Sequence, residues 1–78
     1  MRRLTEAQRQ VLECCPDWSA SWEIAARRTR RFGVEVYSRR TEVLLGRLQS
    51  AGLVEYGAPN QVWRITPAGR AKLAEERG

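Results

Sequence analysis

The sequence predicts a small α+β fold: three helices, then a two-stranded β-hairpin and a short C-terminal helix. Three segments of the first 51 residues carry apolar side chains at the three- and four-residue spacing of an amphipathic helix. Two short apolar runs follow, separated by Gly-Ala-Pro-Asn, whose residues favour a turn. Helices followed by a two-stranded ribbon indicate one α+β domain with a single core, which we expect to span residues 1–78.

The first helix is predicted to begin after Thr5, because Thr5 and Gln8 have the spacing of a capping box, and to stop at Pro16. It contains both cysteines of the chain, Cys14 and Cys15. Adjacent cysteines form a disulfide only with severe strain, and the chain has no histidine to complete a zinc site. We expect small buried apolar side chains here, with a thiol sensor or an intermolecular metal site as the alternatives.

The second helix is predicted to begin near Ser19 or Ser21, either of which can cap it, and to end at Gly33. Its apolar side includes Trp22. We expect Trp22 and Trp63 to lie in the core, because each has apolar neighbours and a large area to bury.

The third helix is predicted to start at a Ser38 cap and to run to about Ala51, with Gly52 ending it. Residues 34–37 precede it as a short extended connector. At 100° per residue, one side of this helix is a core stripe. That stripe consists of Thr41, Leu44, Leu45, Leu48 and Ala51.

The runs at residues 53–56 and 61–65 are predicted to pair as the hairpin, and Thr66 to cap the final helix with Pro67 in its first position.

The net charge of +5 is confined to one third of the chain. Residues 27–47 contain seven arginines and two glutamates, whereas the remainder has seven basic and seven acidic residues. A local basic excess is the electrostatic pattern expected of a protein that binds a polyanion.

Two segments, "LLGRLQSAGLVEY" and "VWRITPAGRAKL", resemble the winged helix-turn-helix of MarR-type and PadR-type bacterial repressors. In those families a Leu-x-x-x-Gly-Leu-Val segment enters the wing and an Arg-Ile-Thr-Pro-x-Gly segment leaves it, as at residues 48–54 and 64–69 here. The chain departs from the pattern in a longer connection before the third helix and in a wing tip without Lys or Arg. It also lacks the long dimerisation helices, so we expect a monomer or a weak homodimer.

The resemblance implies that the third helix is a recognition helix, whose N-terminal part meets base edges in the major groove. Arginine can bridge guanine O6 and N7, and a valine can meet a thymine methyl. The recognition-helix candidates are Ser38, Arg39, Arg40, Glu42, Val43, Gly46 and Arg47. The candidates for phosphate contacts are Arg27, Arg28, Arg30 and Arg31, and those of the wing are Asn60 and Gln61.

Gly46 is unusual on this face, because an exposed glycine inside a helix costs roughly 1 kcal/mol relative to alanine. It either lets the helix approach a groove floor or reflects neutral drift in a helix held by its leucines.

An enzyme is not expected, since the chain has no histidine, no Gly-rich phosphate loop and no paired acids at a plausible cleft. We expect no cofactor and no metal. There is no run of 18 apolar residues and no apolar stretch near the N-terminus, so we expect a cytoplasmic protein that does not enter a membrane.

The sequence therefore predicts a sequence-specific or semi-specific double-stranded DNA-binding protein, acting as a transcriptional regulator or a phage or recombination regulator. The alternatives are a winged-helix protein-interaction module and an RNA-binding module.

Overall fold

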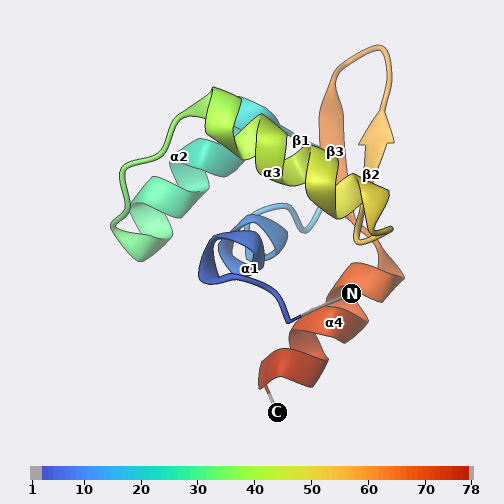
Figure 1. Cartoon of the computed structure of the whole chain (residues 1–78). Coiled ribbons are helices and arrows are strands. Elements are labelled where there is room, and N and C mark those ends of the chain that lie inside the picture. Colours follow the sequence, from blue (N-terminus) through green and yellow to red (C-terminus); the bar gives the residue numbers. More distant parts are fainter. Residues whose placement is uncertain (1–2, 78) are drawn as a thin grey trace.

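The computed structural model describes residues 3–77 and has the predicted α+β class and order of helices and hairpin, with one additional short strand. Figure 1 shows α3 crossing above α1. The hairpin of β2 and β3 rises beside α3, and α4 lies below the hairpin. The elements are α1 Glu6–Glu13, β1 Ser19–Ala20, α2 Ser21–Phe32, α3 Ser38–Ser50, β2 Val54–Gly57, β3 Val62–Ile65 and α4 Pro67–Arg77.

The outer helices begin as the sequence predicts. The Gln8 N–H donates to Thr5 Oγ1 at 3.1 Å and the Thr5 N–H donates to Gln8 Oε1 at 2.9 Å, which completes the capping box of α1. At α4, the Gly69 N–H donates to Thr66 Oγ1 at 3.0 Å, with Pro67 as the first helical residue.

The predicted N-caps of α2 and α3 are each wrong by one residue. Ala20 is the N-cap of α2, and its N–H donates to Glu23 Oε1 at 3.0 Å. Ser19 lies in β1, and Ser21 is the first residue of α2. Tyr37 is the N-cap of α3, and its side chain makes no capping bond. Ser38, the predicted cap, is instead the first helical residue. Glycine ends α2 as predicted, with Gly33 at φ 67°.

The sheet has three strands in the order β1-β3-β2, whereas the sequence predicts two. In β1, Ser19 pairs with Trp63 and Ala20 with Val62 of β3. The strand is two residues long, too short for an alternating pattern to be recognised in the sequence. It ties the start of α2 to the first half of β3, next to the turn of the wing.

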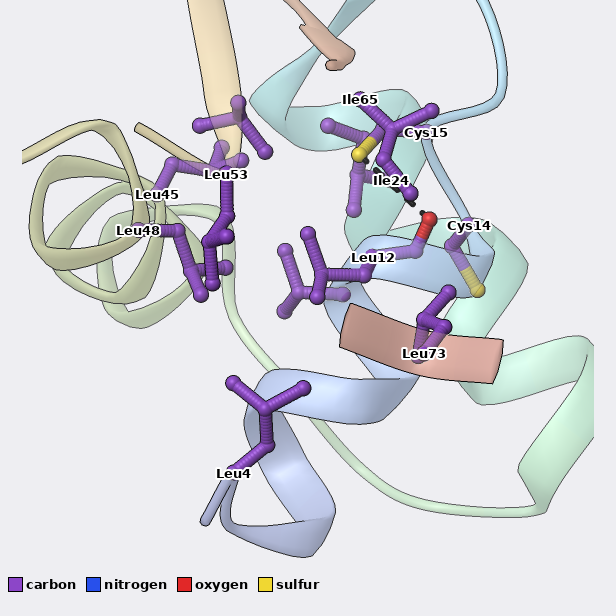
Figure 2. Close-up of a cluster of buried hydrophobic side chains, with 12 residues drawn as sticks. Leu4, Leu12, Cys14, Cys15, Ile24, Leu45, Leu48, Leu53, Ile65 and Leu73 are labelled. Carbon is purple, nitrogen blue, oxygen red and sulfur yellow. Dashed lines mark hydrogen bonds between the residues drawn. The ribbon is translucent and has the colours of Figure 1, made fainter. Parts of the chain in front are cut away.

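The core lies between the helices and the sheet (Figure 2), and the leucine stripe of α3 supplies part of it. Leu45 and Leu48 are fully buried together with Leu12 and Ile24. Trp63 is partly buried against this cluster, but the predicted core position of Trp22 is wrong, because its side chain is 65% exposed.

The buried side of α2 is therefore a different face of the helix from the one that contains Trp22. It consists of Ser21, Ile24, Ala25 and Arg28.

The segment before α1 is fastened to α4 by one carboxylate. Glu76 is largely buried, accepts a hydrogen bond from the Leu4 N–H at 2.8 Å and lies 3.5 Å from Lys72 Nζ. The Leu4 N–H lowers the pKa of the Glu76 carboxyl below its ordinary value, and Lys72 and Arg3 act in the same direction against the effect of burial.

Because its pKa is lowered in the folded state, the Glu76 carboxylate stabilises the protein above the ordinary glutamate pKa of about 4.3. That contribution is lost as the pH falls through the folded pKa. We therefore expect Glu76→Gln to lower the melting temperature at neutral pH, and the gap from the unmodified protein to close below about pH 4. Glu75→Gln, on an exposed side chain of the same helix, is the control and should change little. A gap that does not vary with pH contradicts this role.

Two glycines in helices test the packing in opposite directions. A Cβ at Gly69 would overlap the Leu53 carbonyl oxygen and the Ile65 side chain, whereas a Cβ at Gly46 would meet nothing within 4 Å. We expect Gly69→Ala to lower the free energy of unfolding by about 2 to 3 kcal/mol. Gly46→Ala should raise it by about 0.5 to 1 kcal/mol. Urea unfolding followed by circular dichroism measures both, and equal effects would show that α4 is not packed as described.

Candidate nucleic-acid interface

One face of α3 is open to solvent along the whole helix. Six of the seven recognition-helix candidates are exposed, and the seventh, Ser38, is partly buried. In the core stripe beneath, Thr41, Leu45 and Leu48 are fully buried and Leu44 is partly buried, but the predicted burial of Ala51 is wrong, because this residue is exposed at the C-cap of α3. The predicted division of α3 into a packed and an exposed side is therefore confirmed except at Ala51. The exposed candidates are Arg39, Arg40, Glu42, Val43, Gly46 and Arg47.

The arginines of this face have no partner within the described part of the chain. The side chains of Arg39, Arg40 and Arg47 form neither a hydrogen bond nor an ion pair with any residue in the range 3–77. Arg39 and Arg40 lie in the first turn of α3, which contains no acidic residue and has no side-chain cap. Positive charge is mildly unfavourable at the positive end of a helix. An external anion would stabilise this arrangement.

Glu42 is exposed, but its carboxylate has a hydrogen-bond partner. The Ser21 hydroxyl donates to Glu42 Oε1 at 2.9 Å. This bond fastens the first turn of α2 to the second turn of α3, so the single acid of the exposed α3 face helps to orient the two helices. Its predicted contact with DNA remains untested.

Arg28, one of the four arginines of α2 predicted to contact phosphates, is buried in the domain. Only 4% of Arg28 is exposed, and its Nε and Nη2 lie 3.4 and 3.2 Å from Gln10 Oε1. Burial lowers the pKa of its guanidinium below the ordinary value. In this position Arg28 joins α2 to α1 and cannot reach a phosphate.

Arg27 and Arg31 are also held within the domain. Arg27 Nη1 donates to the Cys14 carbonyl at 3.0 Å and to Ser19 Oγ at 2.6 Å. Arg31 Nη1 lies 3.5 Å from the Glu13 carbonyl oxygen, and its Nη2 lies 3.9 Å from the Glu13 carboxylate. Both guanidiniums pair with the carbonyl end of α1, which has no basic residue in its own last turn.

Arg30 is exposed and unpaired among residues 3–77, but it lies near the far end of α2. The 12 residues of α2 extend over roughly 18 Å, and α2 meets α3 at Ser21. Figure 1 shows the C-terminal end of α2 pointing away from α3 and the wing. The structure thus separates the basic excess into an unpaired group on α3 and a largely paired group on α2.

The wing has little free charge. Asn60 and Gln61 are exposed at its tip, where Gln61 adopts φ 54°. The single arginine of the strands, Arg64, donates from Nε to Glu55 Oε1 at 2.9 Å, and its guanidinium lies 4.4 Å from the centroid of the Trp18 ring. A phosphate contact by the wing would therefore have to come from the neutral side chains at its tip.

Exposed aromatic side chains around α3 were not recognised in the sequence. Trp22 lies at the start of α2, Tyr37 at the start of α3, and Tyr56 in the wing 5.1 Å from the Trp63 ring. Their exposed fractions are 65%, 69% and 41%. Their exposure could have been predicted from their positions near the ends of helices and strands, where a side chain need not face the core.

The cysteines are buried and free, in agreement with a structural role. Cys15 Sγ lies 3.7 Å from the Leu12 carbonyl oxygen (Figure 2), and burial raises the pKa of its thiol to about 12. Burial also raises the pKa of the Cys14 thiol, although Arg31 and Arg28 oppose that shift. Within residues 3–77 there is no group of three or more His, Cys, Asp or Glu side chains that could hold a metal ion.

No protein-family model and no curated protein matches the chain. Its fold is similar to the solved complex structure of hsRosR-S4, with a TM-score of 0.85 at 22% sequence identity over 97% of this chain and 70% of that chain. Together with the three helices and hairpin, this likeness establishes a winged-helix-like fold. The finer resemblance to MarR-type and PadR-type repressors stays a prediction. Among the described residues, no helix is long and apolar enough to cross a membrane.

The raised thiol pKa values predict slow alkylation of the native protein. At pH 8 we expect neither Cys14 nor Cys15 to react appreciably with iodoacetamide, because the thiolate is the reactive form and both side chains are buried. Both should react once urea unfolds the chain. Mass spectrometry after timed quenching counts the modified cysteines, and rapid modification of the folded protein would instead support a thiol sensor.

Proposed function

We propose that this protein is a double-stranded DNA-binding regulator in which α3 enters the major groove. The observation that carries the proposal is the set of three exposed arginines on α3, none of which is paired within residues 3–77. The likeness to the hsRosR-S4 complex supports it at the level of the fold.

The proposed roles follow from position along α3. Arg39 and Arg40 lie in its first turn, which in a helix-turn-helix is the part nearest the base edges. Val43 lies one turn further and would meet a thymine methyl. Arg47 lies nearer the C-terminal end, where a phosphate contact fixes the register of the helix without reading sequence.

Of the four arginines of α2 predicted to contact phosphates, we propose such a contact only for Arg30. Arg27 and Arg28 are committed to bonds within the domain, and Arg31 pairs with Glu13. Arg30 remains available for a duplex that bends toward the end of α2. Asn60 and Gln61 would make uncharged contacts from the wing.

The test is a fluorescence-anisotropy titration of duplex DNA at several salt concentrations. We expect Arg39→Ala with Arg40→Ala to weaken binding and to reduce the slope of log K against log salt by about 2, because each neutralised phosphate releases counterions. Arg30→Ala removes another exposed, unpaired charge, this one from α2, and serves as the control, with a much smaller effect expected than from Arg39→Ala alone. If the double variant binds every duplex as the unmodified protein does, α3 is not the recognition helix.

Gly46→Ala separates the two explanations of that glycine in the same assay. A loss of affinity in a protein that has become more stable would show that Gly46 allows close approach to the groove. Unchanged affinity would show that the glycine has no role in binding.

The neutral wing favours a protein-interaction module as the second candidate function. Failure to bind duplex DNA near physiological salt, alongside a stable complex with a protein partner, would support it. Preference for structured RNA in direct competition with duplex DNA would replace DNA by RNA as the ligand.

A further inference from the structure

A shallow hollow lies along one flank of α3 and has a volume of about 530 Å³. It is formed by residues at the start of α3 and by the side chains that follow on that flank. The lining residues are Tyr37, Arg39, Arg40, Val43, Leu44 and Arg47.

The floor of the hollow is apolar and lacks a partner within the domain. Leu44 is partly buried and packs against the core, while Tyr37 and Val43 are 69% and 53% exposed. Exposed large hydrophobic side chains gathered at one place are typical of an interaction site.

The rim is basic, since Arg39, Arg40 and Arg47 are unpaired among residues 3–77. No acidic side chain lines the hollow. Glu42 lies toward the other flank of α3, where the Ser21 hydroxyl bonds to it, and Glu35 accepts a hydrogen bond from the Tyr37 hydroxyl at 3.3 Å outside the lining.

We propose that this hollow docks an acidic segment of a partner protein, with one bulky apolar side chain of that segment on the floor formed by Tyr37, Val43 and Leu44. The three guanidiniums supply the charge complementarity. A duplex would also satisfy the guanidiniums, but in the grooves its apolar contact groups are thymine methyls, which are small for this floor. Tyrosine and arginine around a pocket are the residue types that carry most of the energy in protein interfaces.

The partner would exclude DNA, because Arg39, Arg40, Val43 and Arg47 belong both to the hollow and to the proposed recognition face. This exclusion rests on the proposed DNA-binding function, whereas the docking does not. An acidic protein segment bound at α3 would thus regulate access of the protein to its DNA site.

The probe is a short fluorescent peptide of Glu and Asp around a single Phe, paired with the same peptide carrying Ser in place of Phe. We expect the Phe peptide to bind the full chain about tenfold more tightly than the Ser peptide, since a buried aromatic anchor contributes at least that much. The Phe peptide should also displace a labelled duplex, and duplex should displace the peptide.

Tyr37→Ala tests the floor without touching a predicted DNA contact. It should reduce binding of the Phe peptide to that of the Ser peptide and leave the melting temperature and duplex affinity nearly unchanged. Trp22→Ala removes an equally exposed aromatic side chain outside the hollow and should leave peptide binding intact.

The outcomes separate the two proposals. Equal binding of the two peptides, or equal losses in Tyr37→Ala and Trp22→Ala, would overturn the docking and leave DNA binding standing. Simultaneous binding of duplex and Phe peptide would overturn the exclusion. Tight binding of the Phe peptide without any duplex binding would support the docking and overturn the proposed DNA function.

Discussion

The carbonyl end of α1 is the constraint on which the arrangement of the helices depends. Its last carbonyl groups have no partner within the helix, and no basic side chain lies in its own last turn. Arg27 and Arg31 of α2 donate to the Cys14 and Glu13 carbonyl oxygens, and Arg28 is buried against Gln10 beside them. An unpaired buried polar group is costly, so these contacts fix α2 against α1. The Ser21–Glu42 bond then transmits that position to α3.

The sequence predicts the fold well because the fold follows from local patterns. The leucine spacing of α3, the Thr5–Gln8 box and the Gly33 and Gly52 ends are encoded within a few residues of one another, and Gly33 and Gly52 both adopt positive φ as a helix end requires. β1 is not predictable in this way. Its two residues acquire strand geometry only by pairing with β3, more than forty positions later in the chain.

The interface was harder to predict than the fold, for a reason that Trp22 and Arg28 illustrate. A shift of one residue in the phase of α2 places Trp22 in solvent and Arg28 in the core. Apolar periodicity alone does not detect this shift, because it depends on hydrogen bonds from Arg27 and Arg28 to the C-terminal half of α1. A count of charge along the sequence cannot distinguish these arginines from the free ones on α3.

The paired side chains of this domain contribute to its stability, whereas the unpaired arginines of α3 are left for the proposed binding. The leucines of α3 and the paired arginines of α2, which are Arg27, Arg28 and Arg31, hold the fold, so their replacement is expected to expose core surface or leave carbonyl groups at the end of α1 unpaired. The exposed face of α3 contributes nothing comparable, and its two first-turn arginines lie where the helix dipole disfavours them. An anion bound there would offset that unfavourable position. Because the same guanidiniums also border the apolar hollow, the proposed duplex and the proposed acidic segment would compete for one small surface, and the chemistry of their apolar groups would decide which of the two prevails.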